Sequence, residues 1–203
     1  MLAIGAHADD IEIGCGGTVL RLVEANRELE LVWVVLCGQV PERAEEARAS
    51  AEWFLSDAGA SRAIVADFRD GFLPHSGPVV KEFFETLKGE VAPDLILTHQ
   101  RRDLHQDHRA ANELTWNTWR DHLVLEYEVP KYDGDVGQPN VYVELSEEIL
   151  ARKIEGLMRH FASQRSKRWF TEDLFRGIAR LRGMESNAAS LHAEAFYGRK
   201  LVL

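Results

Sequence analysis

The chain has 203 residues, 45% of them hydrophobic, and a formal net charge of −9 with a pI near 5.4. This length and composition predict one domain over residues 1–203 with a sizeable core. The negative charge disfavours a nucleic-acid partner, which would need a basic patch. No apolar stretch approaches the roughly 20 residues of a membrane helix, and Asp9 and Asp10 interrupt any secretion signal. We therefore expect a cytoplasmic protein without membrane insertion.

Strand-like and helix-like stretches alternate along the chain. Continuous apolar runs predict strands at 2–6, 31–36, 63–66 and 95–98. Apolar residues at helical spacing predict the intervening helices at 18–26, 42–57, 79–90 and 109–119. Further on, the pattern predicts strands at 123–129 and 141–145, and helices at 146–160 and 171–184, the last of which would close the chain. This rhythm predicts an α/β fold, a Rossmann-like and mostly parallel sheet with helices on both faces.

Polar clusters follow two of the predicted strands. His7 and Asp10 come directly after the run 2–6, and His105 and His108 come shortly after the run 95–98. The carboxyl ends of parallel strands open on one edge of the sheet, where ligands bind in such folds. Two imidazoles and a carboxylate can hold a divalent metal and leave a fourth position open, as catalytic zinc sites do. The two clusters together predict such a site, with Asp9 free for proton transfer.

Each cluster has a simpler interpretation when it is taken alone. An Asp pair after a strand is commonly a helix cap, and a His-x-x-His pair at a helix start is commonly surface decoration. His99, at the end of the run 95–98, is either a contact of the site or a structural residue. The coincidence of both clusters at strand ends favours the metal site.

The motifs resemble those of a known enzyme family. The run 6–18 (AHADDIEIGCGGT) and the run 93–109, which contains DLHQDHR, resemble the signatures of the zinc-dependent N-deacetylases of the PIG-L/LmbE family. Partial matches at Arg43, 153–164 and 193–196 extend the resemblance over nearly the whole chain.

The resemblance implies specific roles for residues of this chain. It makes His7, Asp10 and His108 the zinc ligands, Asp9 the general base and His105 the group that stabilises the oxyanion or protonates the leaving amine. Asp107 would orient a histidine of the same cluster, and Arg43 would lie in the substrate pocket. Since a site of two histidines and one aspartate accepts several first-row ions, Fe²⁺ is an alternative to Zn²⁺.

The implied function is zinc-dependent removal of the acetyl group from an N-acetylated amino sugar, a small-molecule conjugate of the N-acetylglucosamine type. Two positions depart from the family pattern: Ala8 replaces a usual Pro, and Tyr197 stands where many relatives have His, for which His192 could compensate. Alternatives are another metal-dependent amidohydrolase and a non-catalytic sugar-binding protein. The sequence leaves the oligomeric state, including a homo-oligomer, open.

Overall fold

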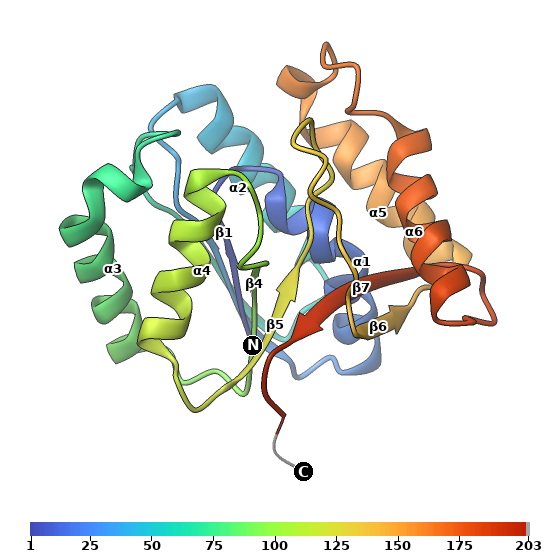
Figure 1. Cartoon of the computed structure of the whole chain (residues 1–203), viewed down its shortest axis with the longest axis horizontal. Helices are drawn as coiled ribbons and strands as arrows, with labels where there is room; N and C mark the ends of the chain where they lie inside the picture. The colour runs from blue at the N-terminus through green and yellow to red at the C-terminus, as the bar shows by residue number, and fades with distance from the viewer. Residues whose placement is uncertain (202–203) are drawn as a thin grey trace.

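A seven-stranded sheet forms the centre of the molecule in the computed structural model, which describes residues 1–201 (Figure 1). The strand order is β3-β2-β1-β4-β5-β7-β6. The first five strands in this order run parallel, and β7 is antiparallel to both β5 and β6. The strands are β1 (Leu2–Gly5), β2 (Glu30–Val35), β3 (Ala60–Val65), β4 (Leu95–His99), β5 (Leu123–Tyr127), β6 (Val141–Glu144) and β7 (Ala193–Gly198).

Helices cover both faces of this sheet (Figure 1). One buried apolar cluster joins the sheet to α1, α2, α5 and α6, and a second joins the opposite face to α3 and α4. The α-helices are α1 (Asp10–Ala25), α2 (Pro41–Phe54), α3 (Gly77–Glu90), α4 (Gln106–Thr118), α5 (Glu147–His160) and α6 (Glu172–Glu185), and two 3₁₀ turns, η1 (Leu73–Ser76) and η2 (Ala162–Gln164), complete the fold. The predicted α/β class is confirmed.

Two predicted elements need correction. The first helix begins at Asp10 rather than Thr18, so the glycine-rich stretch 14–17 lies inside α1 and is not a turn. The helix 171–184 does not close the chain, because β7 follows it and lies between β5 and β6. Ser146 caps α5 as predicted, accepting a hydrogen bond from the Ile149 amide.

The glycines of α1 allow close packing that a larger residue would prevent. A Cβ on Gly14 would lie 2.1 Å from the Tyr127 ring, and one on Gly17 would lie 2.6 Å from Leu145. The close packing that glycine allows here outweighs its low helix propensity. Because glycine is a poor helix former, the sequence pattern does not indicate that these residues are helical.

A buried ion pair ties the last strand to the first helix. Glu194 of β7 accepts hydrogen bonds from the Gly17 and Thr18 amides at 2.8 and 2.6 Å. Lys153 of α5 donates to Glu194 Oε1 and to the Ile13 carbonyl, both at 2.7 Å. Both side chains are almost fully buried, so each charge depends on the other.

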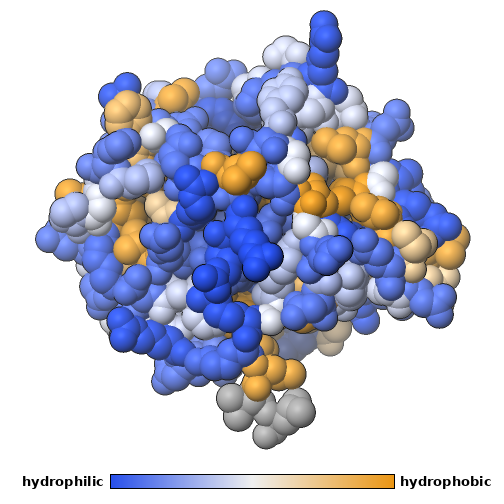
Figure 2. Space-filling model, in the orientation of Figure 1, coloured by the Kyte–Doolittle hydropathy of each residue, from blue (hydrophilic) through white to orange (hydrophobic). Residues whose placement is uncertain are grey.

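The surface is largely hydrophilic in the view of Figure 2, with apolar side chains in separate small patches. Within residues 1–201, no helix combines the length and the apolar character needed to span a bilayer.

The packing of α1 generates a stability prediction. Gly14→Ala should lower the free energy of unfolding by about 1–3 kcal/mol, because its methyl group would overlap the Tyr127 ring. Gly177→Ala is the matched control: it lies inside α6 with no atom near its Cβ position, so it should stabilise by about 0.5–1 kcal/mol. Urea unfolding of the three proteins measures both, and equal midpoints would contradict the packing argument.

Candidate metal centre and its cavity

The site lies where β1 and β4 end side by side. His7 lies two residues beyond the end of β1, Asp9 occupies the N-cap position of α1 without a capping hydrogen bond from its side chain, and Asp10 is the first residue of that helix. From the neighbouring strand β4 the chain passes through a short loop to His105, which caps α4 and accepts a hydrogen bond from the Asp107 amide, with His108 in the first turn. Because α1 and α4 pack on opposite faces, this is the switch point of the sheet, the usual ligand position in open α/β folds.

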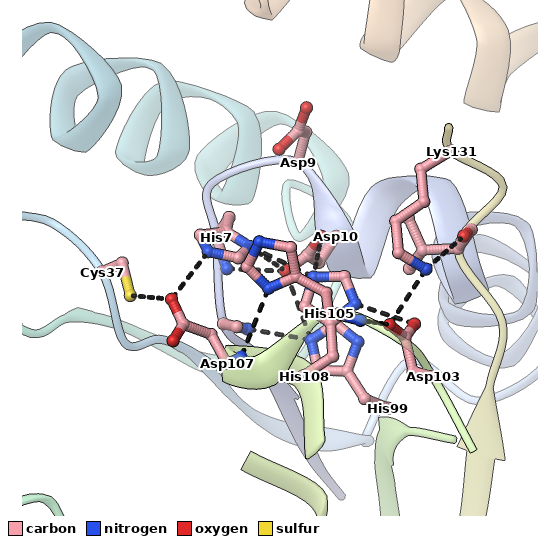
Figure 3. Close-up of polar contacts among 12 residues, drawn as sticks. His7, Asp9, Asp10, Cys37, His99, Asp103, His105, Asp107, His108 and Lys131 are labelled. Atoms are coloured by element: carbon pink, nitrogen blue, oxygen red, sulfur yellow. Dashed lines mark hydrogen bonds and ion pairs between the residues drawn. The ribbon is translucent and has the colours of Figure 1, made fainter. Parts of the chain in front are cut away.

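The side chains of three residues converge at this edge (Figure 3). His7 Nδ1 lies 3.2 Å from Asp10 Oδ2 and 3.2 Å from His108 Nε2, and His108 Nε2 lies 3.4 Å from the other oxygen of Asp10, Oδ1. Ligand atoms bound tetrahedrally at zinc–nitrogen distances of about 2.0–2.1 Å are about 3.3 Å apart. The spacing of the two imidazoles and the carboxylate therefore fits a divalent metal.

His7, Asp10 and His108 are called the trio below. The charges around the trio favour positive charge at its centre. Burial acts to raise the pKa of Asp10, but His108, His99 and His7 outweigh it and hold that pKa well below its usual range. Burial likewise acts to lower the pKa of His7 and of His108, yet contacts with Asp10 bring both above the usual histidine value. A bound cation would place positive charge at the same point.

Buried carboxylates contact the ring nitrogens of His7 and His108 that lie outside the trio. Asp103 Oδ2 lies 2.9 Å from His108 Nδ1, and Asp107 Oδ2 lies 3.3 Å from His7 Nε2. Such contacts orient metal-binding histidines and select the tautomer. Asp107 thus contacts a histidine of the cluster, whereas the sequence offered no role for Asp103. Lys131 Nζ in turn lies 2.9 Å from Asp103 Oδ1 (Figure 3).

His99 supports the trio from the sheet side. Its side chain is fully buried, and its ring stacks on that of His108 with centroids 3.9 Å apart. Nε2 accepts a hydrogen bond from the Ala6 amide at 2.9 Å. Burial, with the neighbouring His108, lowers the pKa of His99 to about 4, so the ring is neutral near pH 7.

His105 lies at the rim of the same cluster and lines the cavity. Its ring centroid is 4.8 Å from that of His7 and 4.7 Å from that of His108. Partial burial, followed by these two neighbours, lowers its pKa. Because Nδ1 accepts a hydrogen bond from the Asp107 amide, neutral His105 carries its proton on Nε2, where it can be donated.

Asp9 points away from the imidazole cluster (Figure 3). Its Oδ1 lies 2.7 Å from Arg43, which also contacts Glu46 at 2.7 Å and Ser163 at 3.1 Å. Burial raises the pKa of Asp9 despite the opposing charge of Arg43. Arg43 also lines the cavity, and its contact with Asp9 could not be read from the sequence.

A cavity of about 500 Å³ opens above the trio, a size typical of small-molecule sites. Its walls come from six segments: the five that follow strands β1 to β5, and residues 164–169 between α5 and α6. The lining residues outside the metal centre include Gln39, Val40, Arg43, Arg69, Lys131, Tyr132, Asp133, Gln164, Lys167 and Trp169.

Of the two positions that depart from the family pattern, one lines the cavity and the other does not. Ala8 is buried in the turn between β1 and α1 and lines the cavity. Tyr197 is paired with Glu126 in the sheet, and His192 Nδ1 lies 3.6 Å from Glu147; neither residue lines the cavity.

Comparison with known proteins agrees with this geometry. The family model PIG-L, described as GlcNAc-PI de-N-acetylase, matches residues 2–119. The uncharacterized deacetylase YaiS of Escherichia coli K12 is 28% identical over 171 residues, which cover 79% of this chain and 89% of that protein.

Solved structures share the fold. The N,N'-diacetylchitobiose deacetylase of Pyrococcus horikoshii superimposes with a TM-score of 0.72 at 21% identity, over 96% of this chain and 81% of its own. GalB, the 4-carboxy-2-hydroxymuconate hydratase of Pseudomonas putida KT2440, gives a TM-score of 0.79 at 18% identity, over 100% of this chain and 96% of its own. Since the family model spans more than half of the chain and includes both strand-end clusters, the chain belongs to the PIG-L family.

Proposed function

We propose that this protein is a metal-dependent deacetylase that hydrolyses the acetamide of an N-acetylated amino sugar of the N-acetylglucosamine type, releasing acetate and the free amine. The observation that carries the proposal is the convergence of His7, Asp10 and His108 within 3.4 Å of one another at the floor of a cavity. Zinc is the metal we propose, with Fe²⁺ as the alternative, because this donor set suits both ions.

The residues divide the work of amide hydrolysis. A divalent cation held by the trio would supply Lewis acidity and lower the pKa of water at the site. Asp9 would accept the proton of the attacking water. His105 Nε2–H would donate to the carbonyl oxygen as negative charge develops there, or to the departing amine. Asp103 and Asp107 would hold the imidazoles of His108 and His7 in position.

Arg43 would serve Asp9 rather than the sugar directly. Its 2.7 Å contact fixes one carboxylate oxygen of Asp9, and Glu46 and Ser163 fix Arg43 in turn. This chain of contacts would restrict the base to one orientation and favour its ionised form.

Family membership and the names of similar structures support the sugar substrate. The P. horikoshii structure is named for diacetylchitobiose, and another similar structure is a deacetylase of the A40926 pseudoaglycone. The likeness to GalB motivates a second candidate, the hydration of a small unsaturated acid. Acetate release from zinc-loaded protein and acetamido sugars tests the first, and loss of the conjugated absorbance of 4-carboxy-2-hydroxymuconate tests the second. Hydration without acetate release would overturn our proposal.

The proposed metal ligands predict the metal content of purified variants. His108→Ala should lose bound zinc or iron on dialysis, because it removes one of three donors and leaves two. His122→Ala is the control, since within residues 1–201 the one charged side chain that His122 contacts is Asp121. Elemental analysis per chain measures the result, and full metal content in His108→Ala would remove this residue from the ligand set.

The base assignment predicts a loss of turnover without loss of metal. Asp9→Asn should lower kcat for acetate release by roughly 10²–10⁴-fold, since the amide side chain cannot accept the proton. Asp173→Asn, which alters an exposed carboxylate in the first turn of α6 and away from the cavity, should retain activity. A metal-loaded Asp9→Asn protein with wild-type kcat would refute the role.

The contact between Arg43 and Asp9 predicts which kinetic constant changes. Arg43→Met should lower kcat by about 10²-fold with little change in KM, because misplacing a catalytic group has effects of this size. Arg43→Lys should recover part of the loss, and Arg48→Met, an exposed substitution on the same helix, should have no effect. A raised KM with unchanged kcat would instead assign Arg43 to substrate binding.

A further inference from the structure

Lys131, in the segment between β5 and β6, is a largely buried cation that the proposed reaction does not use. Its side chain is 10% exposed, and Nζ lies 2.9 Å from Asp103 Oδ1 and 2.7 Å from Asp135 Oδ2. Gly134, with a φ of 65°, lies in the turn that brings Asp135 back to Lys131. Both carboxylates are almost fully buried, so two charge-assisted hydrogen bonds hold the ammonium between them.

Asp135 also ties this segment to the loop that leads into α4. Its Oδ2 accepts a hydrogen bond from the Leu104 amide at 2.7 Å, and its carbonyl accepts one from the Gln100 side chain at 3.2 Å. Lys131 and Asp135 are called the clamp below. The clamp connects the segment between β5 and β6 to the short loop between β4 and α4, from which His105 and His108 follow.

Asp103 is the point where the clamp meets the trio (Figure 3). Its Oδ1 contacts Lys131 and accepts a hydrogen bond from the His105 amide at 2.8 Å, and its Oδ2 lies 2.9 Å from His108 Nδ1. Each oxygen has its own partners, so a rotation of the carboxylate would break contacts on both sides. Because Asp103 holds Nδ1 of His108, its orientation sets the direction in which Nε2 of the same ring faces the trio.

We propose that Lys131 is a positioning residue, which fixes Asp103 and through it the ring of His108 in the orientation that binds metal. This inference rests on the metal site of the proposed function. The charge of Lys131 alone would act in the opposite direction, since a cation near the site repels the metal. Orientation and charge therefore predict opposite signs for the change in zinc affinity when Lys131 is removed.

Zinc affinity, measured by competition with a chelator, tests the positioning role. Lys131→Met should raise the Kd for zinc by roughly 10–100-fold, the usual effect of losing a contact behind a metal-binding histidine. Lys167→Met is the matched control, since it removes a cation of the same cavity that lies over the Trp169 ring, 5.8 Å from its centroid. This control should not weaken zinc binding. An unchanged or lower Kd in Lys131→Met would overturn the proposal.

Trypsin cleavage of the wild-type protein is a second test that needs no variant. Lys131 has to leave the clamp before trypsin can bind its side chain, so the rate of the cut after Lys131 follows the open fraction of the clamp. If the closed clamp favours zinc, zinc favours the closed clamp by the same factor, because coupling is reciprocal. Saturating zinc should therefore slow this cut by roughly 10–100-fold and leave the cut after the exposed Lys167 unchanged. A cut after Lys131 that zinc does not slow, or equal slowing at both lysines, would contradict the link.

Neither measurement depends on turnover, which separates this inference from the proposed function. If zinc binds but no sugar releases acetate, the deacetylase proposal fails, and the two tests still decide the role of Lys131. If the wild-type protein binds no zinc, the metal site and the role of Lys131 are both overturned.

Discussion

The parallel pairing of β1 with β4 is the contact on which the candidate metal site depends. Leu2 pairs with Ile96 and Ala3 with Leu97. The helices that follow these two strands, α1 and α4, pack on opposite faces of the sheet. This pairing brings His7 and His108, 101 residues apart in the chain, to 3.2 Å. A register slip of one residue would displace one cluster by about 3.3 Å, far beyond the roughly 0.2 Å tolerance of a metal site.

The charges of the centre explain why so many residues surround three donors. Asp10 is buried and meets three imidazoles, and the outer nitrogens of His7 and His108 meet Asp107 and Asp103. An unpaired buried charge is costly. The buried Asp10 therefore needs the imidazoles around it, and these imidazoles need the carboxylates of Asp103 and Asp107. Lys131, which contacts Asp103, ends this network at the cavity wall.

The sequence predicted the parts of the structure that follow from local pattern and general topology. Apolar runs gave the β–α alternation, and the rule that parallel strands end at one edge brought His7, Asp10 and His108 together. The start of α1 was missed because Gly14 and Gly17 are poor helix formers that are required by Tyr127 and Leu145, which are distant in the chain. The contacts of Arg43 with Asp9 and of Lys131 with Asp103 depend on loop conformation, which periodicity does not encode.

The buried hydrogen bonds between Glu194 and α1 have a consequence for the order in which the chain folds. The Glu194 carboxylate reaches the Gly17 and Thr18 amides across 177 and 176 residues, nearly the full length of the chain. A nascent chain that has emerged from the ribosome only as far as α6 therefore has Lys153 without its counter-ion beside the helix that carries Asp10. Contacts of such long sequence separation form late, so the cavity at the end of β1 is completed only after synthesis has passed residue 194.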